Sequence, residues 1–108
     1  MEKERRRAPR FQFIAPAELV DETSGARTIA WLSDLGLRGC ALGITDPPRE
    51  GTELQLKIVN AKEHVEARAT VVHRRANHAG MVFNEVKPAS TALLQKWLAT
   101  AKFPKGRV

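Results

Sequence analysis

Residues 52–59, TELQLKIV, alternate between polar and apolar side chains from Glu53 onward. In an extended chain Leu54, Leu56 and Ile58 lie on one face, and the polar residues between them lie on the other. This pattern predicts a β-strand with one side buried and the other side in water.

Strand-like segments occur on both sides of residues 52–59. They are separated by turns rich in Gly, Pro, Asp and Asn, and they cover residues 11–20, 28–32, 37–44, 65–71 and 80–83. Residues 33–36 are expected to end the second strand and separate it from the third. Six short strands with short turns predict an antiparallel barrel or sandwich. Pro16 lacks an N–H donor, so the first strand should lie at an edge or contain a bulge.

A helical pattern follows the last strand, over about residues 88–102. Pro88 suits the first turn, and Ser90 or Thr91 could cap it. One face would carry the apolar residues spaced by three and four: Leu93, Leu94, Trp97, Leu98 and Ala101. We expect Trp97 to pack the helix on the barrel; stacking on a base is the alternative.

The chain has 108 residues, of which 43% are hydrophobic and 28% charged, as in a soluble single-domain protein. No apolar run is long enough to span a bilayer, and no export signal is evident. We therefore expect a cytoplasmic location without membrane insertion. The lone Cys40 cannot form an internal disulfide and is expected to be a small buried thiol.

The net charge of +6 belongs to the two ends of the chain. Residues 1–10 hold five basic and two acidic side chains (+3), and residues 102–108 hold three basic ones (+3). Residues 11–101 hold ten of each sign, so the body is neutral. This distribution does not predict a nucleic-acid partner, which would require a broad basic face, but the ends could bind a local anion.

Signatures of catalysis are missing from the sequence. There is no Gly-rich phosphate loop, no His/Cys cluster with zinc-ligand spacing and no Ser/His/Asp grouping. His73 continues the apolar face after Val71, which predicts a partly buried structural histidine. We therefore expect no enzyme activity, no metal and no cofactor.

Two other features suggest ligand chemistry. The first is the basic arm Arg5-Arg6-Arg7-Ala8-Pro9-Arg10, in which Pro9 stiffens the backbone between Arg6 and Arg10. A guanidinium group pairs with phosphate oxygens and with the O6/N7 edge of guanine. The alternative interpretation is a solvated basic tail.

The second feature is Asp34-Leu35-Gly36-Leu37-Arg38-Gly39. Two glycines allow a ligand to approach the backbone closely, and Asp34 could accept hydrogen bonds from guanine N1–H and N2–H₂. Alternatively, Asp34 only caps the turn through its own backbone.

Together these features resemble the PilZ family, whose signature is R-x-x-x-R before the first strand and D/N-x-S-x-x-G between the second and third strands. Arg6 and Arg10 match the first motif, and Asp34 and Gly39 match the second. The family's Ser is Gly36 here, which removes a hydrogen bond worth about 0.5–1.5 kcal/mol. A second register, with Ser33 as the Ser and Gly36 as the Gly, would put Trp31 at the position of the acidic or amide residue.

The resemblance implies a mainly all-β fold, a six-stranded antiparallel PilZ-type β-barrel with a C-terminal helix over residues 11–103. Residues 1–10 would form a basic arm and residues 104–108 a basic tail. The implied function is bacterial second-messenger signalling, in which cyclic di-GMP binding is coupled to an effector protein.

The resemblance also assigns roles to residues of this chain. Arg6 and Arg10 would clamp the ligand, Asp34 would hold a guanine edge, and Gly36 and Gly39 would give backbone access. Supporting charges would come from Arg5, Arg7 and Arg38, although Arg38 could equally be a solvated surface residue. Two alternatives stay open: a degenerate PilZ module that binds proteins but no nucleotide, and a small nucleic-acid-binding barrel.

Overall fold

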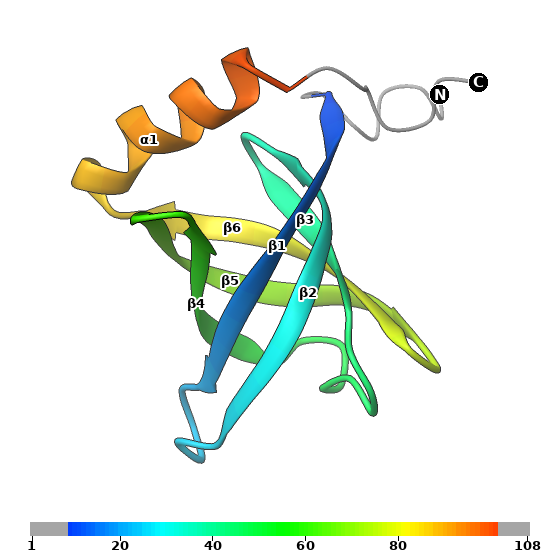
Figure 1. Cartoon of the computed structure of the whole chain (residues 1–108). Coiled ribbons are helices and arrows are strands. Elements are labelled where there is room, and N and C mark those ends of the chain that lie inside the picture. The colour runs from blue at the N-terminus through cyan, green and yellow to red at the C-terminus, as the bar shows by residue number, and fades with distance from the viewer. Residues whose placement is uncertain (1–8, 102–108) are drawn as a thin grey trace, which may run out of the picture.

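The computed structural model describes residues 9–101. Six antiparallel strands form a closed barrel in the order β1-β2-β3-β6-β5-β4 (Figure 1). The elements are β1 (Arg10–Asp21), β2 (Arg27–Gly36), β3 (Gly39–Gly43), β4 (Glu53–Asn60), β5 (Glu63–Arg75), β6 (His78–Val86) and α1 (Pro88–Ala99). The predicted six-stranded antiparallel barrel with a C-terminal helix is thus confirmed.

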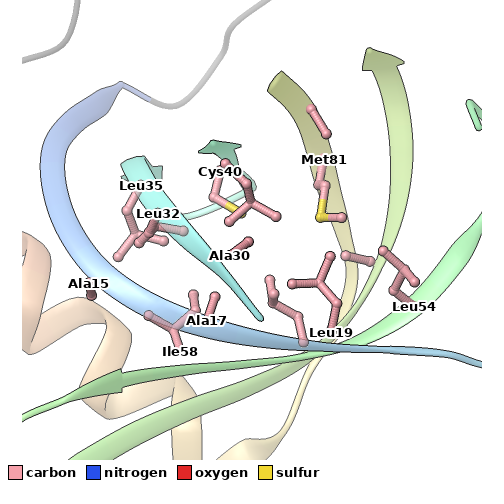
Figure 2. Close-up of a cluster of buried hydrophobic side chains, with 14 of the residues drawn as sticks. Ala15, Ala17, Leu19, Ala30, Leu32, Leu35, Cys40, Leu54, Ile58 and Met81 are labelled. Atoms are coloured by element: carbon pink, nitrogen blue, oxygen red, sulfur yellow. The ribbon is translucent and has the colours of Figure 1, made fainter. Parts of the chain in front are cut away.

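The barrel interior is filled by the inward face of every strand. On β4 the alternation is as predicted: Leu54, Leu56 and Ile58 are at most 2% exposed, while the residues between them face water. Figure 2 shows Leu35, Cys40 and other apolar side chains turned into the same core. Burying one such large side chain stabilises the fold by roughly 1.5–3 kcal/mol.

Strand β1 contains the bulge that the sequence suggested, but it is not an edge strand, because it pairs with both β2 and β4 in the closed barrel. β1 pairs with β4 only from Ala17 to Asp21, so Pro16 lies just outside that ladder. The register of β1 against β2 also shifts between Gln12 and Ala15, which marks a bulge. The missing N–H of Pro16 therefore interrupts no β1–β4 hydrogen bond.

Several strand ends differ from the prediction. Residues 33–36 do not interrupt β2, because a register shift between Leu32 and Asp34 lets the strand continue to Gly36. Asp34 consequently lies within a strand, and only Leu37 and Arg38 separate β2 from β3. The hairpin between β5 and β6 is similarly tighter than predicted, because Arg74 pairs with Ala79 and Arg75 with His78.

The predicted burial of His73 is wrong. A register shift between Val71 and His73 ends the simple alternation of β5, and His73 is exposed. Its ring lies over Gly80 of β6, where an added Cβ would be 2.4 Å from His73 Cε1. The bulge therefore moves this histidine from the core side to the outer surface.

The helix α1 lies across one end of the barrel and packs on β5 (Figure 1). Leu94 and Trp97 are its buried apolar residues, which confirms Trp97 as a packing residue. The Trp97 ring stacks on Phe13 of β1 at 5.4 Å between centroids, and its Nε1–H donates to Glu63 of β5 over 2.9 Å. Three elements are thus joined at one indole ring.

The predicted helix cap is wrong, and the helix ends earlier than predicted. Lys87 is the N-cap and provides no side-chain hydrogen bond. Ser90 Oγ instead accepts the backbone N–H of Glu66 over 2.9 Å, which ties α1 to β5. Ala101 follows the end of the helix at Ala99. Within residues 9–101, no helix combines the length and the apolar character needed to cross a membrane.

Candidate outer-face site at β1, β2 and β3

The outer face of the barrel brings together four of the predicted site residues. Strand pairing places Arg10 opposite Gly36, and Asp34 opposite both Gln12 and Ala41. Leu35 is fully buried in the core. Because side chains alternate along a strand, its neighbours Asp34 and Gly36 lie on the outer face.

Arg10 and Asp34 form an ion pair at this face. Arg10 Nη1 donates to Asp34 Oδ1 over 3.1 Å, and the two side chains are only 15% and 5% exposed. A charge-assisted hydrogen bond of this kind is stronger than a neutral one. The sequence predicted both residues as ligand contacts but did not predict that they contact each other.

Gly36 and Gly39 both sit where the chain approaches itself closely. A Cβ on Gly36 would lie 2.7 Å from the carbonyl oxygen of Pro9 and 3.2 Å from Arg10 Cγ. A Cβ on Gly39 would lie 2.2 Å from the carbonyl oxygen of Met81 and 3.1 Å from Arg10 Nη2. The missing side chains thus make room for the start of β1, for β6 and for the Arg10 side chain itself.

Of the remaining predicted site residues, only Arg38 lies in the described part of the chain. Arg38 is exposed in the turn between β2 and β3, and its backbone carbonyl accepts the N–H of Phe83 over 2.8 Å. Arg5, Arg6 and Arg7 lie outside the described residues, so their roles remain predictions.

Cys40 lies directly beneath the site and faces the core. It is fully buried, as predicted. Burial raises the pKa of its thiol to about 12; the nearby charge of Arg10 has a smaller lowering effect, and that of Asp34 a smaller raising effect. A thiol with that pKa is almost entirely protonated at neutral pH and is a poor nucleophile.

Val82 is a site neighbour that the sequence analysis missed. It pairs with Gly39 and is 37% exposed, next to a residue without a side chain. Because side chains alternate along a strand and Met81 is buried, the sequence could have indicated that the Val82 side chain points outward. Val82 offers an apolar surface on which a flat ring could rest beside the ion pair.

Two surface grooves among the described residues lie elsewhere. One, of about 400 Å³, is lined mainly by charged outer residues of β1, β4 and β5, including Glu18, Lys57 and Arg68. The other lies near Asp46 and Pro48. Neither groove includes Arg10 or Asp34. In the same residues no cluster of three or more His, Cys, Asp or Glu side chains could hold a metal ion.

Comparison with solved structures identifies the same barrel in other proteins. The PilZ domain of CeSA, from a cellulose-synthesizing bacterium, is 13% identical with a TM-score of 0.69, and the match covers 83% of this chain and 94% of that one. The inhibitor of motility MotI/DgrA from Bacillus subtilis is 16% identical with a TM-score of 0.69, over 91% of this chain and 54% of that one. At these identities the likeness shows the fold alone.

MrkH, described as a c-di-GMP-dependent transcription regulatory factor, is 18% identical with a TM-score of 0.71, over 88% of this chain and half of that one. The complex of K. pneumonia MrkH with c-di-GMP is 17% identical with a TM-score of 0.66, over the same shares. This chain thus spans about half the length of MotI/DgrA and MrkH. No curated protein sequence matches it significantly. The family model for the PilZ domain matches residues 4–100, and the chain therefore belongs to the PilZ domain family.

Proposed function

We propose that this chain is a cyclic di-GMP receptor domain that passes ligand binding on to a partner protein. The observation that carries the proposal is the meeting of Arg10 and Asp34 on the outer face, one from the start of β1 and the other from β2. Arg10 is the described arginine of the R-x-x-x-R motif, and Asp34 is the acidic residue of the D/N-x-S-x-x-G motif. The fold likeness to MrkH, which is solved in complex with c-di-GMP, adds support.

The chemistry of these two side chains fits the two parts of the ligand. Cyclic di-GMP carries two phosphates and two guanines. The planar fork of Arg10 suits a phosphate or the O6/N7 edge of a guanine. The carboxylate of Asp34 accepts hydrogen bonds, and guanine N1–H and N2–H₂ donate them. One arginine and one carboxylate therefore supply complementary partners for an anionic guanine nucleotide.

The rest of the site would come from the arm and the turn. Arg6 would bind a second phosphate, and Arg5, Arg7 or Arg38 would add charge. The backbone at Gly36 and Gly39 would offer N–H donors. Ordering the arm costs roughly 1–2 kcal/mol per residue in backbone entropy, so the ligand must provide several charged contacts, and two phosphates and two guanines do.

A route from the site to a partner runs along β1. Three residues after Arg10, Phe13 stacks on Trp97 of α1. A rearrangement at the start of β1 would therefore disturb the packing of α1 and change the surface offered to an effector protein.

Gly36 favours a second candidate, a PilZ module that binds a protein partner without nucleotide. The hydroxyl lost at this position is worth at most about tenfold in affinity. The pairing of Asp34 with Arg10 also reduces the acceptor capacity available to a guanine. Both observations weaken nucleotide binding without removing the charged groups that would carry it.

Isothermal titration with cyclic di-GMP tests the proposal on the wild type, Arg10→Ala and Arg49→Ala. Arg49 is an exposed arginine in the loop between β3 and β4 and serves as the matched control. We expect saturable heat with the wild type and Arg49→Ala, and weaker binding with Arg10→Ala, since a charge-assisted contact is worth roughly 1.5–3 kcal/mol.

The other outcomes identify the alternatives. If none of the three proteins gives heat at high micromolar ligand, the remaining candidate is the PilZ module that binds a protein partner without nucleotide. Retarded single-stranded RNA or DNA, released at raised salt, would instead favour the nucleic-acid-binding barrel.

A further inference from the structure

Arg10 has the same hydrogen-bonding character as the ligand group that Asp34 is proposed to hold. A guanidinium presents N–H donors in one plane, as does the N1–H/N2–H₂ edge of guanine. Arg10 already donates to Asp34 Oδ1 over 3.1 Å, and the Asp34 side chain is only 5% exposed. So little carboxylate surface is accessible that a guanine edge can pair with Asp34 only after its surroundings, Arg10 among them, rearrange.

We propose that Arg10 is an internal competitor of guanine for Asp34, and that Gly36 permits this self-occupied form of the site. The proposal deepens the proposed function and rests on it where ligand binding is concerned. In this form, called closed below, Arg10 is bonded to Asp34. In the open form Arg10 leaves Asp34 for a phosphate, and the carboxylate accepts a guanine.

Gly36 is the residue that lets the closed form pack. Arg10 and Gly36 are directly opposite in the β1–β2 ladder. A Cβ at position 36 would lie 2.7 Å from the Pro9 carbonyl oxygen, which is backbone, and 3.2 Å from Arg10 Cγ. Any larger residue at position 36 therefore forces the start of β1 outward and weakens the Arg10–Asp34 contact.

The population of the closed form sets the apparent affinity. When only a fraction of the molecules can bind, the apparent Kd equals the intrinsic Kd divided by that fraction. If nine in ten molecules are closed, opening the site tightens apparent binding about tenfold. A Cβ at position 36 should then strengthen binding through opening, even without a hydroxyl.

Two substitutions separate opening from restoration of a hydroxyl. Gly36→Ala adds only the Cβ, whereas Gly36→Ser adds the Cβ and the oxygen. Gly43→Ala is the matched control, because a Cβ at this β3 position is 3.9 Å from its nearest neighbour. The first measurement is backbone hydrogen exchange of residues 10–12 without ligand, and the second is titration with cyclic di-GMP.

We expect faster exchange of residues 10–12 for both Gly36→Ala and Gly36→Ser. Binding should tighten about tenfold for Gly36→Ala and at least that much for Gly36→Ser, which also restores the hydroxyl. Gly43→Ala should be like the wild type in both measurements. Tightening by Gly36→Ser alone, weaker binding by both variants, or unchanged exchange would each overturn the proposal. Should the Gly36 variants fail to fold, Asp34→Asn keeps the shape of the side chain. In the Asp34→Asn variant without ligand, backbone hydrogen exchange of residues 10–12 must then be faster than in the wild type. Unchanged exchange would refute the closed form.

The two proposals fail in different ways. If neither the wild type nor any variant binds the dinucleotide, the proposed function is wrong, and the exchange measurement still decides whether Arg10 and Gly36 hold the start of β1 down. If the wild type binds but exchange is unaffected by Gly36→Ala, the receptor function stands and the competitor role of Arg10 is wrong.

Discussion

The two tryptophans of this chain offer a direct test of how the barrel is closed at one end. Trp97 is 3% exposed, stacks on Phe13 and donates to Glu63. Trp31 is 58% exposed on the outer face of β2. Replacing each with Ala removes the same side chain from two opposite environments.

The magnitude follows from this burial. Removing a buried aromatic side chain costs about 3–5 kcal/mol, including roughly 0.5–1.5 kcal/mol for the aromatic pair. That is a large part of the 5–15 kcal/mol that typically stabilises a domain. Trp31→Ala leaves no cavity, so its cost should stay within about 1 kcal/mol, the span of strand propensities.

Urea unfolding followed by far-ultraviolet circular dichroism measures both variants. With a slope of about 1–3 kcal/mol per molar urea, Trp97→Ala should lower the midpoint by one molar or more, and Trp31→Ala by much less. Equal shifts for the two variants, or a loss below about 1 kcal/mol for Trp97→Ala, would refute the packing role given to α1.

Three further outcomes are expected. Hydrogen bonds from the Trp97 indole and from Lys96 lower the pKa of Glu63 in the folded protein. Such a carboxyl stabilises the fold at a pH above its pKa in the unfolded chain, and the stabilisation is lost as the pH falls through its pKa in the folded protein. The stability of the wild type should thus decline as the pH falls below about 4.5, and Glu63→Gln should flatten this decline in acid titrations of unfolding. Cys40 should resist a thiol reagent at pH 8 in the folded protein and react in urea; a fast native reaction would contradict its burial. Gly80→Ala should destabilise the fold, because the added Cβ would collide with the His73 ring. Adding His73→Ala should recover part of this loss of unfolding free energy in a double-mutant cycle. If the losses of the two single variants simply add, the two sites are independent.

The parts of the fold that the sequence predicts are those in which one local pattern acts alone. The alternation in β4 identified its buried face, and the spacing around Trp97 identified the packed face of α1. In β2 and β5 the alternation breaks at register shifts, near Ser33 and before His73. A bulge depends on pairing with a neighbouring strand, so a single sequence does not reveal it, and Asp34 and His73 were misplaced for this reason.

The candidate site was predictable as a set of residues but not as an arrangement. Arg10 and Asp34 were identified by their chemistry, and their 3.1 Å contact depends on the pairing of β1 with β2. The outward direction of Val82 likewise depends on the barrel. Gly36 was interpreted as a lost hydroxyl and as a point of backbone access for a ligand; its close approach to Pro9 and Arg10 was not predicted.

The central claim concerns a guanine held by Asp34 beside phosphate-binding arginines. Its most direct test is titration of the wild type and Asp34→Asn with cyclic di-GMP and with cyclic di-AMP. The two ligands share their phosphates and differ in the bases, and adenine lacks the N1–H and N2–H₂ donors. We predict saturable binding of cyclic di-GMP to the wild type, weaker binding to Asp34→Asn, and little binding of cyclic di-AMP to either protein. Equal affinity of the wild type for both dinucleotides would contradict the account.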